Sequence, residues 1–296
     1  MIEAAVIVLR LFQYAAGSIL MGSALFVLYA LPRQNSRPSW AKPLLAAAAL
    51  SLTVSALASY LAQTALLAGS WHDALAADAL GAVLSISLGK AVLVRAGAAA
   101  LAALMLIVAR PGRPSWVTSA ALGTAAVVTF GWMGHGADGV PWLQLIGDIV
   151  HVLAAATWIG ALVAFLFVMR SATEPSNITV LQEALRRFSA GGVPLVALLV
   201  LSGLINSWFL VGVDNVASLL ATGYGRLLSL KVALFAGMLG LAALNRNRHT
   251  PAIERTHGEP AAIRTLRRSV ALEFALGLSV LAAVAWLGTL APPAAS

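Results

Sequence analysis

The sequence predicts an all-α fold, a polytopic membrane helical bundle of about eight transmembrane helices. Of its 296 residues, 60% are hydrophobic and only 10% are charged, whereas a soluble domain carries about 25% charged residues. A soluble chain of this length would also need a large polar surface. The apolar residues fall into long runs separated by short polar breaks. We therefore expect lipid to cover most of the surface.

Eight stretches have the roughly 20 apolar residues that a helix needs to cross the hydrocarbon core. They are residues 4–31, 43–68, 81–109, 115–134, 142–169, 187–212, 226–245 and 269–290. The breaks carry residues that end helices, such as Pro32 and the Arg-Pro-Gly-Arg-Pro run at 110–114, and Pro292-Pro293 closes the last stretch. Met1-Ile2-Glu3 lacks a basic region and a cleavage site, so it is interpreted as the start of the first helix. With no convincing internal repeat, residues 1–296 are expected to form a single integral membrane domain.

The basic residues give these helices a direction, because Lys and Arg gather in cytoplasmic loops. Fourteen of the 19 basic residues lie in the loops after the first, third, fifth and seventh stretches. The alternate loops carry Asp73, Asp78, Asp138 and Asp214, with only Arg226 at an edge. The sequence therefore predicts an even number of crossings with both termini outside, which is the periplasm if the cell is Gram-negative.

Composition also excludes several classes of protein. The chain has no cysteine, which rules out disulfides, thiolate metal sites and iron–sulfur clusters. The net charge is +8. The basic residues lie in the short gaps between apolar runs, where they set membrane topology, so a nucleic-acid partner is rejected. No HExxH helix, Gly-x-Ser-x-Gly elbow or P-loop is found. We expect a protein that is not an enzyme, whose transport, if any, uses no ATP.

Six charged residues fall inside the predicted spans: Arg10, Lys90, Arg95, Asp148, Lys231 and Glu273. Charges at this depth are costly and usually face a bundle interior or a cavity. Counting from each span's start at 1.5 Å per residue places Arg95 near the middle and Glu273 in the inner half. The other four lie in the outer half, with Arg10 near enough to the end to extend into water. They are either interhelical ion pairs that fix packing or parts of a functional site.

Potential metal ligands also gather on the outer side. Asp148 and His151 are three residues apart and so share one helical face, on which Trp158 lies two turns later. Met133 and His135 end the preceding span, and the short loop between the two spans should bring all four ligands together. A further histidine, His72, lies in another outer loop, whereas His249 and His257 belong to the basic cytoplasmic loop.

The donor types leave the bound species open. Imidazole with thioether suits copper, and imidazole with carboxylate also suits zinc or another divalent metal. Lys90 and Lys231 lie in the same outer half, where their charge would repel an incoming cation. Either Asp148 neutralises them, or they hold an anion such as a haem propionate.

Four sequence blocks resemble the copper resistance protein D family (CopD/PcoD-like). Residues 147–162 are similar to its His-then-Trp-x-Gly helix, and Arg187-Phe188-Ser189 with Ser202-Gly203 to its next block. Residues 224–231, ending at Asn245-Arg246, resemble its seventh-helix signature, and residues 266–273 with Pro292-Pro293 its last block. The resemblance covers about residues 130–293, and the first four spans fit in number and order with weaker motifs. The individual residues that match the family's motifs are His151, Trp158, Tyr224, Gly225, Arg226, Lys231 and Glu273.

This resemblance implies a bacterial inner-membrane protein of copper homeostasis and resistance, with copper, Cu(I) or Cu(II), passing toward the cytoplasm. It also implies a periplasmic CopC-like copper-binding partner, here as a separate chain. On this hypothesis His151, His135, Met133 and Asp148 bind the metal, while Glu273 and Arg95 form a gate or ion pair deeper in. One alternative is a haem-binding, cytochrome-like redox protein with Lys90, Lys231 or Arg226 near the propionates. Another is a non-transporting membrane partner of a periplasmic copper chaperone.

Overall fold

The computed structural model describes residues 1–35, 37–132, 141–172, 174–212, 214–216 and 218–295. Over these residues the chain is helical, without a β-strand. The long helices are α1 (Ile2–Ser18), α3 (Ala41–Ala68), α5 (Ser87–Val108), α6 (Arg113–Trp132), α7 (Trp142–Ser171), α8 (Pro175–Val211), α9 (Gly223–Leu244) and α11 (Pro260–Leu287). The short helix α2 (Ala24–Tyr29) continues the line of α1. The other short helices are α4 (Ala77–Ser85) and α10 (Thr250–Arg255), and π-helical turns are η1 (Ile19–Ser23) and η5 (Asn245–His249). The 3₁₀ turns are Arg33–Asn35, Asp73–Leu75, Leu219–Ala221 and Pro293–Ala295.

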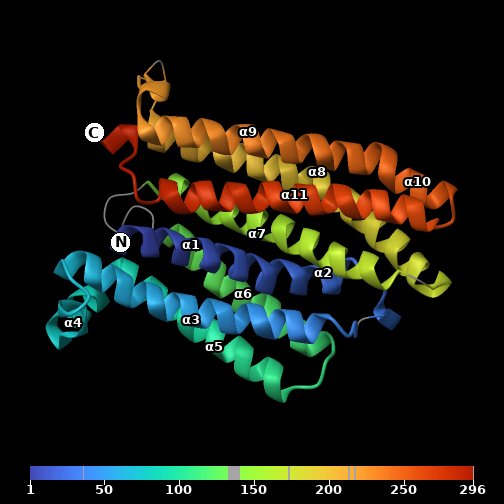
Figure 1. Ribbon diagram of the computed structural model, residues 1–296, viewed down its shortest axis with the longest axis horizontal. Helices are drawn as coiled ribbons and strands as arrows, with labels where there is room; N and C mark the ends of the chain where they lie inside the picture. The colour runs from blue at the N-terminus through green and yellow to red at the C-terminus, as the bar shows by residue number, and fades with distance from the viewer. Residues whose placement is uncertain (36, 133–140, 173, 213, 217, 296) are drawn as a thin grey trace.

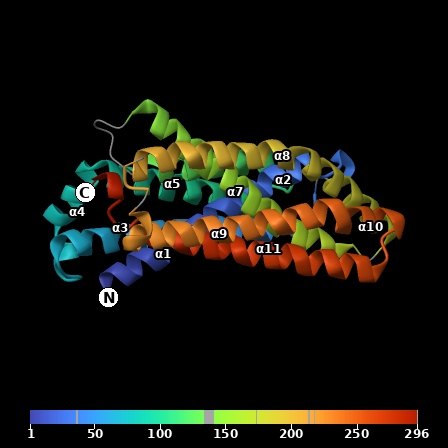
Figure 2. The same ribbon diagram turned by 90° about the horizontal axis from the view of Figure 1, so that it is seen from above.

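Seven helices of the described chain are long and apolar enough to cross a membrane. They correspond to all the predicted spans except 115–134, which is helix α6. This helix has 20 residues but is less apolar, because Ser115, Ser119 and Thr129 are buried on its packed faces. Both termini lie at the same end of the bundle (Figures 1 and 2). That arrangement requires an even number of passes, so α6 traverses the bundle as well.

Helix α7 is the most buried of the seven and lies at the centre of the bundle. It packs against α1, α2 and α6 on one side and against α8 and α11 on the other. Helices α3 and α5 complete the first side, and α9 packs on α11 to complete the second (Figure 1). The two halves of the chain are joined through α7 and through a direct contact of α1 with α11.

The closest approach between these halves lies where η1 crosses α7. Gly22 and Gly160 face each other so closely that a Cβ on either glycine would meet backbone atoms of the other helix. Next to them, the buried Ser23 Oγ donates a hydrogen bond of 2.8 Å to the Gly160 carbonyl oxygen. Small residues that let two backbones approach are the usual way helices pack within a membrane.

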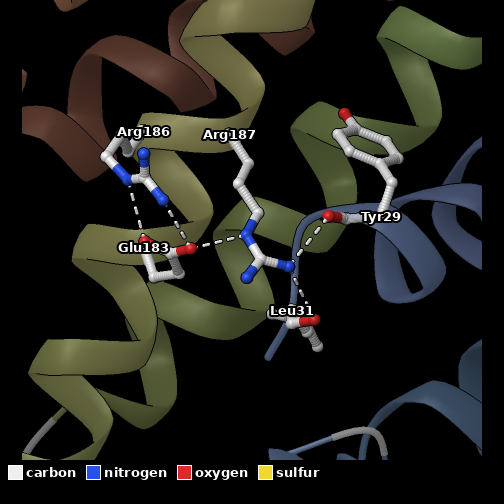
Figure 3. Close-up of polar contacts among 5 residues, drawn as sticks. All are labelled: Tyr29, Leu31, Glu183, Arg186 and Arg187. Carbon is white, nitrogen blue, oxygen red and sulfur yellow. Dashed lines mark hydrogen bonds and ion pairs between the residues drawn. The ribbon is translucent and has the colours of Figure 1, made fainter. Parts of the chain in front are cut away.

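The basic loops meet at the end of the bundle opposite the termini, which we call the basic end; the other is the terminal end. Basic side chains satisfy carbonyl groups at helix C-termini there, as the helix dipole favours. Lys42 Nζ donates to the carbonyl oxygens of Ile107 and Ala109, at 3.3 and 3.0 Å. Arg187 bridges Glu183 to the carbonyl oxygens of Tyr29 and Leu31, linking α8 to the end of α2 (Figure 3).

Some helix bounds differ from the predicted spans. The stretch 81–109 is broken at Ile86, whose extended backbone separates α4 from α5. There the chain turns so tightly that a Cβ on Gly89 would meet the Val83 carbonyl oxygen. Helices α8 and α11 begin at Pro175 and Pro260, about ten residues before the predicted spans, because polar segments outside the apolar core continue the helix.

Candidate functional site

Three cavities lie one after another along the second half of the bundle. We call them the terminal cavity (about 300 Å³), the middle cavity (about 370 Å³) and the basic-end cavity (about 270 Å³). The first two share His151, Gly203 and Lys231 among their lining residues. The last two share Trp158 and Leu239. Neighbouring cavities therefore adjoin at these shared residues.

The terminal cavity collects polar side chains from four helices, α1, α7, α8 and α9. Its polar lining residues are Arg10, Tyr14, Asp148, His151, Asn206, Ser207, Tyr224 and Lys231. The negative charge of Asp148 acts on both Lys231 and Tyr224. This negative charge partly offsets the positive charge of Lys231, which would otherwise repel a cation in the terminal cavity. Two buried atoms there, Arg10 Nε and Asn206 Oδ1, have no hydrogen-bond partner within the described chain.

The hydrogen bonds of Ser202 fix which nitrogen of His151 carries a proton. Ser202 Oγ lies 2.5 Å from the Leu198 carbonyl oxygen, to which it must donate its single hydrogen. It also lies 3.0 Å from His151 Nδ1. Because the hydroxyl has no second hydrogen, Nδ1–H donates and Ser202 Oγ accepts. The lone pair of His151 then resides on Nε2, which leaves that atom as the ring nitrogen able to accept a hydrogen bond or bind a metal.

The middle cavity is mainly apolar. Ala, Val, Leu, Ile and Phe side chains of α7, α8, α9 and α11 make up most of its lining, with Met238 at the α9–α11 contact. His151 and Lys231 mark one end of it and Trp158 the other. A hydrated ion would not be stabilised here, whereas a dehydrated soft cation near a thioether is better tolerated.

Trp158 and two polar residues form a buried cluster at the wall of the basic-end cavity. Trp158 Nε1 donates to Glu273 Oε1 at 2.8 Å, and Asn245 Nδ2 donates to Glu273 Oε2 at 2.9 Å. Glu273 is 2% exposed and Asn245 is 8% exposed. The cluster joins α7, η5 and α11, and its carboxylate has neutral hydrogen-bond donors.

Asp148 and His151 are the two predicted metal ligands of the terminal cavity that the structure describes. Within the described chain no group of three His, Asp or Glu side chains is placed to hold a metal ion. Asp148 and His151 supply one carboxylate and one imidazole, the pair that suits Cu(II) or another divalent metal. Met133 and His135, the other two predicted ligands, lie outside the described residues.

Comparison with known proteins decides the family. A family model for "Copper resistance protein D" matches residues 182–287, and one for "Copper resistance protein D-like, N-terminal domain" matches residues 1–145. The chain is 38% identical to "Copper resistance protein D" of Pseudomonas syringae pv. tomato, over 97% of this chain and 96% of that protein. The chain belongs to the copper resistance protein D family.

Two other relatives are more distant. "Inner membrane protein YebZ" of Escherichia coli K12 is 27% identical over 83% of each chain. "Copper transport protein CutJ" of Bacillus subtilis 168 is 29% identical over 50% of this chain and 26% of that protein. No solved structure matches the chain.

The family predicted from the sequence is thus confirmed, with a wider reach than expected. The N-terminal model matches the first four spans, where only weak motifs were recognised. Tyr224, Lys231 and Glu273 fall within the second model. The helix with His151 and Trp158 lies between the two matched segments. In the structure this helix is α7, which joins the two halves.

Other predicted residues are not brought to the three cavities. Lys90 and Arg226 are exposed, and His72, with its side chain 98% exposed, lies beside Asp73 in a loop. Arg95 is buried on the opposite side of α7, where Nε donates to Thr129 Oγ1 at 2.9 Å. Its guanidinium also donates to Gln13 and covers the Phe130 ring at 3.8 Å.

Arg95 and Glu273 therefore lie in different polar clusters, and a role of either residue as a gate stays a prediction. Arg95 joins α5 to α1 and α6, whereas Glu273 joins α11 to α7 and η5.

Sequence reasoning gave no role to three neutral polar residues: Ser202 and Asn245, which were quoted only as parts of the family blocks, and Asn206. Each is an uncharged polar residue within or at the end of an apolar run. The cost of burying a polar group without a partner applies to amides and hydroxyls as well as to charges. Searching the spans for them would have found all three.

Proposed function

We propose that this protein carries copper ions across the bacterial inner membrane through the line of cavities between α7, α8, α9 and α11, without chemical conversion of a substrate. The observation that carries the proposal is the sharing of lining residues. His151 and Lys231 lie between the terminal and middle cavities, and Trp158 and Leu239 between the middle and basic-end cavities. A cation that passes these side chains traverses most of the bundle.

The entrance is the terminal cavity, where Asp148 and His151 take the ion from water. Asp148 offers the negative charge that attracts a cation, and His151 Nε2 offers a nitrogen ligand whose orientation Ser202 holds. The names of two relatives, a copper resistance protein and a copper transport protein, support copper as the cargo.

The charge pattern supports the orientation of this route. With the basic end in the cytoplasm, the terminal cavity and both termini face the periplasm. A separate CopC-like copper-binding protein would then deliver copper to the terminal end, and the ion would leave at the basic end.

Copper uptake by proteoliposomes tests the route through the junction at Gly203. A Cβ at Gly203 would lie 3.5 Å from His151 Cε1, so a small side chain fits and a larger one enters the junction. We expect Gly203→Leu to lower uptake at least tenfold. Gly240→Leu is the matched control, because nothing lies within 4 Å of a Cβ there. Equal uptake by the two variants would exclude this path.

A haem-binding redox protein is the second candidate. The middle cavity is apolar and carries His151, as a haem site requires. However, His151 is the one histidine of the described chain that lines these three cavities. Two imidazole ligands from that part of the chain are therefore not available. A Soret band in the purified protein's visible spectrum would favour haem over copper transport.

The third candidate is a membrane partner of a periplasmic copper chaperone that moves no ion. On that hypothesis Lys231 and Glu273 stabilise the bundle and do nothing else. Neutralising either would lower stability without changing copper transport or binding relative to the wild type, whose proteoliposomes take up no more copper than protein-free liposomes.

A further inference from the structure

We propose that Glu273 is a reversible proton-binding site that exchanges its proton for a cation in the basic-end cavity; the coupling to copper rests on the proposed function. The carboxyl group is 2% exposed and lines the cavity toward which the cation route leads. Intramembrane carboxyl groups on a cavity wall are typical of proton and ion pathways.

The hydrogen bonds around Glu273 can satisfy both protonation states. Trp158 Nε1 can only donate, so Oε1 is always an acceptor. Oε2 faces the Asn245 side-chain amide, which donates through Nδ2 at 2.9 Å. A half-turn of that amide presents Oδ1 instead, and Oδ1 accepts a hydrogen bond from a protonated Oε2. The proton is therefore assigned to Oε2.

Asn245 carries an independent sign of this second arrangement. Its Oδ1 is buried without a hydrogen-bond partner within the described chain, and the residue is 8% exposed. A buried acceptor without a partner is costly. The half-turn gives it one whenever Glu273 is protonated. Asn245 also begins the π-helical turn η5, and such turns are frequent at functional sites.

Few charges compete with a cation for Glu273. Arg246 is the other charged side chain of the described chain that lines the basic-end cavity, and it is exposed at the mouth. The residues that α8 and α10 contribute to the lining are uncharged. His151 and Lys231 face the middle cavity, beyond Trp158.

Exchange then follows from electrostatics. A cation in the cavity favours the ionised carboxylate, because opposite charges attract strongly where water is scarce. It therefore releases the proton. By reciprocity, a proton on Glu273 weakens binding of the cation by the same factor. Copper moving toward the basic end would be accompanied by protons moving the other way.

Infrared difference spectra of the purified protein test the proton site without transport. A carboxylic-acid C=O band that disappears as pH rises should be present in the wild type, absent in Glu273→Gln and retained in Glu273→Asp. Adding copper chloride at constant pH should remove the same band. The control Glu254→Gln changes an exposed carboxyl group of α10 and should keep it. Identical wild-type and Glu273→Gln spectra would overturn the site.

Proteoliposomes with a lumenal pH dye test the coupling. We expect copper uptake by the wild type to drive protons outward, above the signal of protein-free liposomes, and Glu273→Gln to lose this proton movement. Copper uptake without proton movement would overturn the exchange and leave the proposed transport intact. A wild type that takes up no copper contradicts the proposed function, and with it the coupling, whereas the infrared band then still decides the proton site.

Discussion

Trp158 and Glu273, 115 residues apart in the chain, are joined by a buried hydrogen bond of 2.8 Å from the indole Nε1 to Oε1. The bond ties the central helix α7 to α11. It also places an aromatic side chain between the middle and basic-end cavities. Trp158 is thus both a support for Glu273 and part of the boundary that a cation must pass.

Replacing Trp158 with Phe removes this hydrogen bond and keeps an aromatic ring. We expect the free energy of unfolding to fall by about 1–3 kcal/mol, because the buried carboxyl oxygen loses its donor. Denaturation of the purified protein in mixed micelles measures the change. Trp286→Phe is the control, since Trp286 is 54% exposed; equal losses in the two variants would contradict a special role for Trp158.

Ser202→Ala should weaken copper binding without unfolding the protein. The hydroxyl group holds His151 with Nδ1 protonated and Nε2 free. Loss of such a supporting hydrogen bond typically costs about 10–100-fold in metal affinity. Equilibrium titration with copper measures the effect, and Ser229→Ala, whose hydroxyl bonds its own helix at Gly225, is the matched control. If both variants bind copper equally well, Ser202 does not set the tautomer of a ligand.

Gly22→Ala should disrupt the contact between η1 and α7. The added methyl group would overlap backbone atoms of Ala156 and Gly160, and the two helices can only separate. We expect a loss of at least about 2 kcal/mol in the free energy of unfolding, as for severe overpacking. Gly240→Ala, with nothing within 4 Å of the new Cβ, should change it by less than about 0.5 kcal/mol. A Gly22→Ala protein as stable as the control would contradict this close crossing.

The two neighbouring arginines of α8 should differ in their effect on stability. Arg187 bonds Glu183 and reaches the Tyr29 and Leu31 carbonyl oxygens, whereas Arg186 bonds Glu183 alone (Figure 3). We expect Arg187→Ala to lower the free energy of unfolding by about 1 kcal/mol. Arg186→Ala should have little effect, because exposed ion pairs contribute little. Denaturation in mixed micelles compares them, and an order reversed from this one would rule out the link to α2.

The membrane bundle was predictable because long apolar runs leave a chain few alternatives in lipid. The break at Ile86 was not, since it depends on α4 folding back until Val83 meets Gly89. That contact joins residues only six apart in the chain, but it leaves no mark on hydropathy. Helix α6 shows the opposite limit, because its buried serines make it less apolar although it packs along α5 and α7, two of the candidate membrane-spanning helices.

The candidate site was partly predictable for a similar reason. The depth of a residue in the membrane can be counted along its span. This count placed Asp148, His151 and Lys231 in the same half, and all three line the terminal cavity. The direction in which a side chain points around its helix depends on neighbouring helices. Lys90 has a matching depth but is exposed. Whether Met133 and His135 join the site stays a prediction.

The most direct measurement of the central claim is the initial rate of copper uptake into proteoliposomes that contain wild type, His151→Ala or His72→Ala. Both variants lose one histidine on the terminal side, but only His151 lines the cavities, and the His72 side chain is 98% exposed. We predict that His72→Ala keeps the wild-type rate and that His151→Ala falls to the rate of protein-free liposomes. Uptake by His151→Ala at the wild-type rate would contradict the account.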